Sequence, residues 1–119
     1  MTPDKDVVLG CYYITKIKPD ALGTGKVFGS ETEAVLAYQS GIIRLKAKIR
    51  VRIQGKLLET CVGRVLFNEV LPSELQFINE VMDKKRLRAV LRECYRQFGT
   101  ERTAVLIDDI KKLGFTLVR

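Results

Sequence analysis

The sequence of 119 residues predicts a small mixed α+β fold. Apolar and polar residues alternate over residues 43–54, which is the pattern of a strand with one buried face. Apolar residues then recur at helical spacing on both sides of Gly99, which predicts paired helices over residues 84–98 and 100–113. With an N-terminal helix and a basic β-hairpin, these elements are expected to form one α+β domain over residues 1–119.

Length and composition are those of an ordinary globular domain. The chain is 46% apolar and 29% charged, and no apolar run is long enough to predict a transmembrane helix. Its first residues lack the basic and apolar regions of a signal peptide, so we expect a cytoplasmic protein without a membrane partner.

The absence of histidine excludes Ser-His-Asp and Cys-His catalysis and His-ligated zinc. Three cysteines without a Cys-x-x-Cys pair are expected to be reduced, buried thiols: Cys11, Cys61 and Cys94.

The first predicted helix covers residues 3–15, because Thr2 can cap it and Pro3 favours the first helical position. Its apolar residues share one face at i, i+4 and i+7: Val7, Cys11 and Ile14. The glycines of residues 23–25 predict a loop after this helix. The Gly-Thr-Gly-Lys stretch there lacks the spacing of a phosphate-binding loop, so a turn is the preferred interpretation.

A second, short helix is predicted over residues 31–39. Ser30 and Glu33 form a capping box, in which the hydroxyl and the carboxylate each accept a backbone N–H. Gly41 is expected at the C′ position, where a left-handed backbone ends many helices.

The strand of residues 43–54 is expected to continue through a turn into a return strand over residues 57–62. Gly63 is expected to break this return strand, before a short helix over residues 64–70.

Asp83 is the expected N-cap of the helix over residues 84–98, and Gly114 is expected to close the helix over residues 100–113. The residues expected to face the core are Leu87, Val90, Leu91, Cys94 and Phe98, and then Thr103, Leu106, Ile107, Ile110 and Leu113.

The net charge of +7 is concentrated in two stretches. Residues 42–64 carry seven Lys or Arg side chains against Glu59, and residues 84–96 carry six against Glu93. In the first stretch the strand would project five cations at intervals of about 7 Å: Arg44, Lys46, Lys48, Arg50 and Arg52. Such clusters suit a polyanion, but they also describe a solvated face or a sheet edge guarded against unwanted pairing.

No catalytic constellation is evident. Asp108 and Asp109 are neighbours on a predicted helix and do not share a face, so they do not predict a shared metal ion. A Ser, Thr or Lys nucleophile would lack an activating histidine. From the residues alone, the sequence describes a basic α+β domain without an active site.

The order and spacing of several stretches resemble the largest (β′) subunits of bacterial DNA-directed RNA polymerases. The similarity runs from Thr2 to Phe115, and no single short motif decides it. It is carried by residues 2–3, 6–13, 45–53, 59–68, 71–72, 77–80, 83–85, 87, 91–96, 99–104 and 106–115.

This resemblance implies a non-catalytic part of the subunit, the pore or funnel domain. That domain borders the secondary channel, where nucleotides enter and the RNA 3′ end is extruded. The family's Asp-rich metal motif lies upstream and its bridge helix and trigger loop lie downstream. We therefore expect an excised piece of a longer subunit, without nucleotidyltransferase activity or a cofactor of its own, since Mg²⁺ would be held by residues outside it.

The implied partners are the remainder of β′, the β and ω subunits, nucleoside triphosphates, the RNA 3′ end and transcript-cleavage factors at the channel. The resemblance is to bacterial subunits, and it leaves a plastid homologue open. The isolated piece is expected to self-associate, because excision exposes apolar surface that the assembly covers.

The sequence departs from the family pattern near its end. Thr116-Leu117 replace an aromatic-Ala pair, which weakens the prediction of a C-terminal strand. In some family members the last helix helps to bind ppGpp. Asp108 matches that site, but Glu101 replaces a basic residue and Lys112 an aromatic one, so the site is not transferred.

The predicted functional residues are basic. We expect Lys84, Lys85 and Arg88 to face the channel and to favour incoming triphosphates, with the strand row of residues 44–52 as the second candidate. The rival hypothesis is a free-standing nucleic-acid-binding module that uses this row. A third, an enzyme acting on phosphorylated substrates, is disfavoured by the missing histidine. Without a recognition helix or stacking aromatics, any binding is expected to be electrostatic and salt-dependent.

Overall fold

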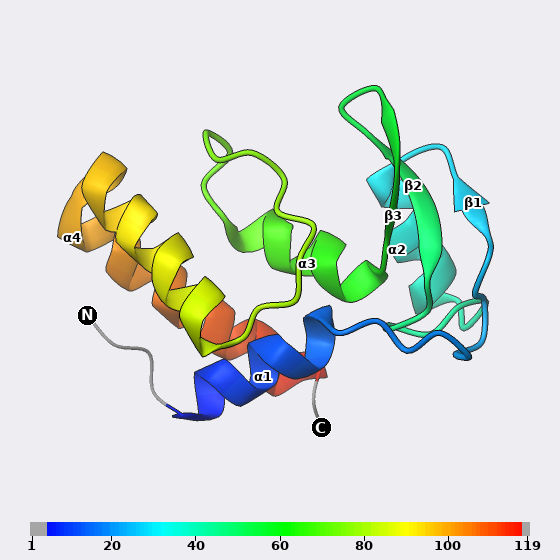
Figure 1. The fold of residues 1–119 in the computed structure, drawn as a ribbon, viewed down its shortest axis with the longest axis horizontal. Coiled ribbons are helices and arrows are strands. Elements are labelled where there is room, and N and C mark those ends of the chain that lie inside the picture. The colour runs from blue at the N-terminus through cyan, green and yellow to red at the C-terminus, as the bar shows by residue number, and fades with distance from the viewer. Residues whose placement is uncertain (1–4, 118–119) are drawn as a thin grey trace.

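The computed structural model describes residues 5–117 and confirms the α+β class. Figure 1 shows a small sheet with α2 beside it at one end of the molecule and α1 with the long α4 at the other. Helix α3 lies between these two groups and packs on α1, α2 and α4. The molecule measures 38 × 31 × 21 Å along its principal axes.

Helix α1 (Lys5–Thr15) confirms the first predicted helix over the described residues. The predicted cap at Thr2 and Pro3 lies outside them. The helix buries Val7, Cys11 and Ile14, the apolar face that the spacing indicated. In the loop that follows, Gly23 and Gly25 adopt φ values of 98° and 94°, and residues 22–25 form the predicted turn.

Helix α2 (Glu31–Gln39) has the predicted bounds, with Gly41 at φ 81° after its C-cap. Ser30 Oγ accepts the Glu33 N–H at 3.1 Å. The Glu33 carboxylate, however, accepts the Gly29 N–H at 2.7 Å, so its bond falls one residue before the position of a standard capping box.

The sheet has the strand order β1-β2-β3 (β1 Val27–Phe28, β2 Ile49–Ile53, β3 Lys56–Thr60). β1 runs parallel to β2 and was not predicted, because two residues are too few to show a period. β2 and β3 form the predicted antiparallel hairpin, with Ile53 opposite Lys56. Positive φ values at Gln54 (53°) and Gly55 (82°) fit the type I′ turn that two-residue hairpins prefer.

The strand predicted over residues 43–54 is too long, since the ladder begins only at Ile49. The backbone before it bonds to other segments: Lys46 O accepts the Lys18 N–H and Lys48 O accepts the Gly25 N–H, both at 2.8 Å. The burial alternation nevertheless continues through this irregular segment, because Ile43, Leu45 and Ala47 are buried. The alternating pattern therefore identified the buried face correctly and the secondary structure only in part.

Helix α3 (Val62–Val70) starts earlier than predicted and contains Gly63, which was expected to break a strand. Gly63 has another role, because it lies against the C-terminal end of α1. A Cβ atom there would lie 1.6 Å from Ile14 O, so only glycine allows this approach.

Helix α4 (Lys84–Leu117) contains both predicted C-terminal helices. Gly99, at φ 87° and ψ −173°, separates a first half (84–98) from a second half (100–117), and the chain folds back on itself there (Figure 1). Gly114 does not close the helix, which continues to Leu117 without a C-terminal strand among the described residues. Gly114 instead faces α1, where its added Cβ would lie 3.8 Å from Gly10 Cα.

One buried apolar cluster runs from α1 through the sheet to both halves of α4. It includes most of the residues predicted to face the core, with Leu87, Leu91, Leu106 and Ile110 at most 2% exposed. None of the helices in the described part of the chain is long and apolar enough to cross a membrane.

Candidate functional site

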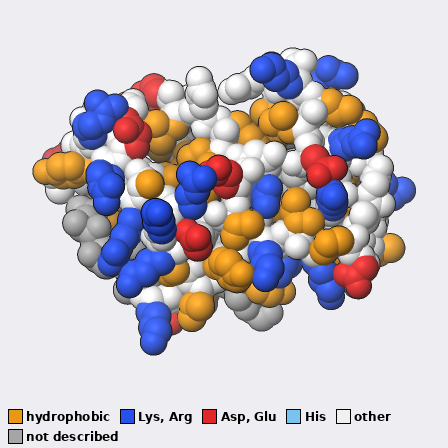
Figure 2. Space-filling model, viewed as in Figure 1, with side chains coloured by type: hydrophobic (Ala, Val, Ile, Leu, Met, Phe, Trp, Pro, Cys, Tyr) orange, Lys and Arg blue, Asp and Glu red, His pale blue; other side chains and the backbone are white. Residues whose placement is uncertain are grey.

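The predicted cations at the start of α4 lie together on the surface. Lys84, Lys85 and Arg88 are exposed, in the first two turns after the N-cap Asp83. The cap is confirmed, because Asp83 Oδ1 accepts the Arg86 N–H at 2.8 Å. No carboxylate within residues 5–117 pairs with any of these three cations. In Figure 2, Lys and Arg side chains gather on the part of the face that α4 forms.

The second predicted surface, the row from Arg44 to Arg52, is divided. Only Arg50 and Arg52 lie on β2, where both are exposed. Arg52 Nη1 donates to Gly55 O in the hairpin turn at 3.4 Å. Arg44 lies in the irregular segment before the strand and is also exposed.

The remaining two cations of the row have partners within the chain. Lys48 Nζ lies 3.4 Å from Glu59 Oε1 on β3. Lys46 Nζ lies over the ring of Tyr13 on α1, 3.8 Å from its centroid, which is a cation–π distance. The five cations therefore do not form one continuous face along a strand.

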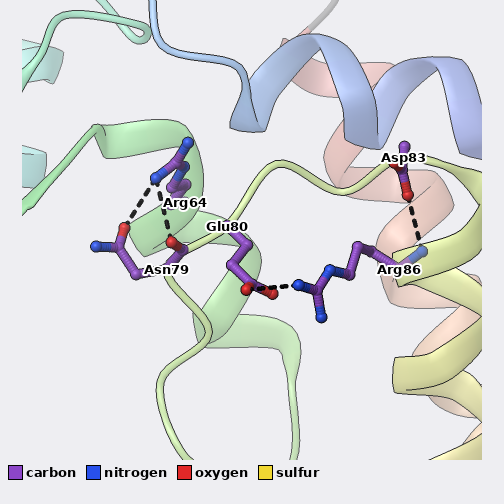
Figure 3. Close-up of polar contacts among 5 residues, drawn as sticks. All are labelled: Arg64, Asn79, Glu80, Asp83 and Arg86. Atoms are coloured by element: carbon purple, nitrogen blue, oxygen red, sulfur yellow. Dashed lines mark hydrogen bonds and ion pairs between the residues drawn. The ribbon is translucent and has the colours of Figure 1, made fainter.

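Arg64 on α3 is the most buried charged side chain of the described residues, at 9% exposure. Its Nε donates to Thr15 O at 2.8 Å, at the C-terminal end of α1, where a helix dipole favours a cation. Its Nη1 donates to Asn79 Oδ1 at 3.1 Å and to Asn79 O at 3.3 Å (Figure 3). One guanidinium thus joins α1, α3 and the connector of residues 71–83 that leads to α4.

Two asparagines hold the connector between α3 and α4 in place. Asn68 Oδ1 accepts the Ile78 N–H at 2.7 Å, and Asn68 Nδ2 donates to Ile78 O at 2.9 Å. Asn79 Nδ2 donates to Glu59 O on β3 at 2.8 Å. The connector is therefore tied to α3 and to the sheet before α4 begins.

The last part of the connector is fixed by two further contacts. Met82 N donates to Thr15 Oγ1 at 2.8 Å, which ties the connector to α1. Glu80 accepts from Arg86 Nη2 at 2.8 Å, across the start of α4 (Figure 3). These contacts set the position of the helix start that carries Lys84, Lys85 and Arg88.

The three thiols are buried and free, as predicted. Burial raises the pKa of Cys11 from its ordinary value near 9 to about 12, and burial also raises the pKa of Cys61. Both side chains stay protonated at neutral pH, so neither is an activated nucleophile.

The described residues contain no group of three His, Cys, Asp or Glu side chains close enough to hold a metal ion. Asp108 instead pairs with Lys112 one helical turn away, at 3.3 Å. The exposed group of Lys84, Lys85 and Arg88 at the start of α4 can attract anions electrostatically.

The family model of RNA polymerase Rpb1, domain 3, matches residues 1–119. The chain belongs to this family.

The curated relatives of this Rpb1 domain 3 include proteins named DNA-directed RNA polymerase subunit beta'. The chain is 51% identical to that of Desulforudis audaxviator over 114 residues, which cover 95% of the chain and 10% of the relative. It is 48% identical to that of Sulfurihydrogenibium sp. over 95% of the chain and 7% of the relative, and 49% identical to that of Desulforamulus reducens over 96% and 10%. These relatives confirm the resemblance to bacterial β′ subunits noted in the sequence. The chain spans a tenth or less of their length.

The structural role of Arg64 in this Rpb1 domain 3 was not predicted from the sequence. Arg64 was counted only as one of the cations of residues 42–64, although the residues around it are apolar or small: Cys61, Val62, Gly63 and Val65. A single cation inside such a run indicates a buried, hydrogen-bonded guanidinium. Asn79 gave no comparable signal, because its partners are distant in the sequence.

Proposed function

We propose that residues 1–119 act as one non-catalytic domain of the β′ subunit of a bacterial DNA-directed RNA polymerase, bordering the secondary channel. There the start of α4 would favour incoming nucleoside triphosphates. Nucleotidyl transfer and Mg²⁺ would belong to other parts of the polymerase. The proposed partners are the remainder of β′, the β and ω subunits, the RNA 3′ end and transcript-cleavage factors, in the cytoplasm.

The observation that carries this proposal is the exposed group of Lys84, Lys85 and Arg88 without a carboxylate partner among the described residues. A helix N-terminus is the positive end of the helix dipole, and a cation there costs about 0.3–1 kcal/mol. Helix stability therefore does not account for these three side chains. A nearby polyanion would turn the same arrangement into a favourable one.

The rigidity of the helix start supports the proposal. Asn68, Asn79 and Arg64 hold the connector through hydrogen bonds to backbone groups or to one another. A fixed start of α4 keeps its cations in a constant geometry, so attraction of an anion needs little further ordering of the backbone.

The rival hypothesis, a free-standing nucleic-acid-binding module, depended on a continuous row from Arg44 to Arg52. Lys46 contacts Tyr13 and Lys48 contacts Glu59 instead. The row therefore lacks the uniform basic face that is needed to follow the phosphate backbone of a nucleic acid. Arg50 and Arg52 remain the exposed cations on β2.

The test is a triple variant, Lys84→Ala, Lys85→Ala and Arg88→Ala, in the full-length β′ subunit of the assembled polymerase. We expect the apparent KM for nucleoside triphosphates to rise roughly threefold to tenfold at low salt, and its salt dependence to become shallower, because fewer counterions are released on binding.

A matched triple variant carries the same change of charge on exposed lysines elsewhere: Lys18→Ala, Lys26→Ala and Lys56→Ala. It is expected to leave the apparent KM and the salt slope unchanged. If both triple variants behave like the unaltered polymerase, the cations of α4 are only a solvated surface and the proposal is wrong. If binding of duplex DNA falls instead of nucleotide affinity, the rival hypothesis is favoured.

A further inference from the structure

The surface between α1 and the second half of α4 contains an open groove that the proposed function does not use. The two helices approach closely at Gly10 and Gly114, where an added Cβ on Gly10 would lie 3.6 Å from Gly114 Cα. Beside this crossing the groove has a volume of about 990 Å³. Its apolar lining includes Leu9 and Tyr13 from α1 and Phe115 from α4.

The exposure of these side chains indicates a macromolecular occupant. Leu9 is 60% exposed, Tyr13 46% and Phe115 79%. Large apolar side chains that share one exposed surface usually mark a protein interaction site. A pocket for a small ligand buries most of the ligand surface, whereas these walls stand open to solvent.

The charged side chains that line the groove are Lys16, Lys46 and Lys111 against Asp6, so its rim carries a net positive charge. Lys46 Nζ lies 3.8 Å from the centroid of the Tyr13 ring, and Lys16 Nζ lies 3.0 Å from Tyr12 Oη and 5.2 Å from the centroid of its ring. Within residues 5–117 no carboxylate pairs with Lys16 or Lys46. An occupant that brings carboxylates to these two ammonium groups would complement both the charge and the apolar floor.

The source of the occupant follows from the comparisons. The matched relatives are at least about ten times as long as the part that the chain covers. Most of such a polypeptide lies outside residues 1–119 and is covalently tethered to this surface, which gives it a high effective concentration at the groove. A segment of the same polypeptide therefore needs less intrinsic affinity than a separate molecule.

We propose that this groove is the docking site for another segment of the full-length β′ polypeptide. That segment places apolar side chains against Leu9, Tyr13 and Phe115 and carboxylates beside Lys16 and Lys46. This inference rests on the proposed function, because it requires the chain to work within a full-length β′ subunit.

The test uses the assembled polymerase with p-benzoylphenylalanine in place of Leu9 in the full-length β′ subunit. Irradiation and mass spectrometry then identify the cross-linked peptide. We expect a peptide of the same β′ chain, outside residues 1–119, that contains apolar residues and Asp or Glu. The matched control places the same photoreactive residue at Leu36 on α2, which is 53% exposed and lies away from the groove. It should not capture that peptide.

Charge reversal tests the electrostatic part of the proposal. Lys46→Glu and Lys16→Glu should each lower the yield of the Leu9 cross-link by roughly threefold, since like charges would then face each other. Lys26→Glu, at an exposed lysine outside the groove, should not change it. Replacing the acidic residue of the captured peptide by Lys should restore the yield in the Lys46→Glu subunit.

Four results would overturn the inference: no cross-link at Leu9, a cross-link to another subunit, a cross-link to a second polymerase molecule, or an unchanged yield of the Leu9 cross-link in the Lys46→Glu subunit. All four presuppose a polymerase that assembles with this subunit. They are thus distinct from failure of the proposed function, which appears as unchanged nucleotide affinity in the triple variant of α4.

Discussion

The sheet and the helical end of the molecule, formed by α1 and α4, satisfy their polar groups in different ways. In the sheet, β2 and β3 bond to each other through a regular ladder with a two-residue turn, and the Lys48–Glu59 pair lies across it on the surface. At the helical end, side chains bond to backbone groups: Arg64 to Thr15 O and Thr15 Oγ1 to the Met82 N–H. The sheet is therefore held by a repeating pattern, whereas the helical end depends on single residues.

This difference predicts where the molecule is sensitive to substitution. A ladder distributes its stabilisation over many similar bonds, so one altered surface side chain changes little. Around Arg64, the polar groups are satisfied by a few individual side chains, and removing one of these side chains leaves its partners unsatisfied. The largest effects are therefore expected at the junction between the two regions, and the smallest on the sheet surface.

The largest effect is expected from Gly63→Ala. The new Cβ would lie 1.6 Å from Ile14 O, so α3 and the end of α1 must separate. We expect the free energy of unfolding to fall by roughly 3 kcal/mol or more, measured by urea denaturation. The control is Gly10→Ala, where the new Cβ makes an ordinary contact at 3.6 Å with Gly114 Cα and the change should stay within about 1 kcal/mol. Similar losses in both variants would contradict this reading of Gly63.

Arg64→Met should have the next largest effect. It removes the bonds to Thr15 O, which is left without this partner in a buried region, and the bonds to Asn79, which is partly buried. The expected cost is about 2–4 kcal/mol in the free energy of unfolding. Hydrogen exchange should quicken at the Met82 and Leu87 amides before it quickens in β2.

Arg50→Met, on the exposed face of β2, is the control and should change the free energy of unfolding by less than about 0.5 kcal/mol. Equal loss of protection in the sheet and the connector of the Arg64→Met variant would show that Arg64 stabilises the whole fold and not the helical end in particular.

An intermediate effect is expected from Asp83→Ala, which removes the acceptor of the Arg86 N–H at the start of α4. Loss of an N-cap should lower the free energy of unfolding by about 1 kcal/mol. Asp83→Asn keeps an acceptor oxygen and should recover most of that loss. A variant with alanine that is as stable as the parent would mean that the Glu80–Arg86 and Met82–Thr15 contacts fix this helix start without the cap.

The smallest effect is expected from Lys48→Met in the sheet. Its ion pair with Glu59 is exposed on both sides, so its removal should cost at most about 0.5 kcal/mol and nothing measurable at high salt. Denaturation at low and at high salt checks this. A large, salt-independent loss would show that the sheet also depends on single residues, and the contrast between the two regions would fail.

The sequence predicted the elements whose signal is local. The capping residues around α2, the burial alternation from Ile43 to Ile53 and the apolar faces on both sides of Gly99 all depend on neighbours within one or two turns. The basic group at Lys84, Lys85 and Arg88 was likewise visible as a charge cluster, and the structure exposes it.

The remaining features depend on contacts between distant segments. The ladder of β2 begins late because the loop of residues 18–25 bonds to the chain ahead of it. Gly63 and Gly114 were interpreted as helix or strand breakers, since a close approach to Ile14 O or Gly10 leaves no mark in the neighbouring residues. Arg64 and the groove between α1 and α4 likewise exist only once the chain has folded.

The close approach of Gly10 to Gly114 has a consequence for the order of folding. The two glycines lie at opposite ends of the chain, so this contact closes a loop of almost the whole sequence, and contacts of such large separation form slowly. At a synthesis rate of about 5–20 residues per second, roughly 5–20 s pass between the addition of the two residues on a ribosome. During that interval the apolar face of α1 lacks the second half of α4 as a packing partner. Helix α1 can therefore complete its packing only after Gly114 has been added to the nascent chain.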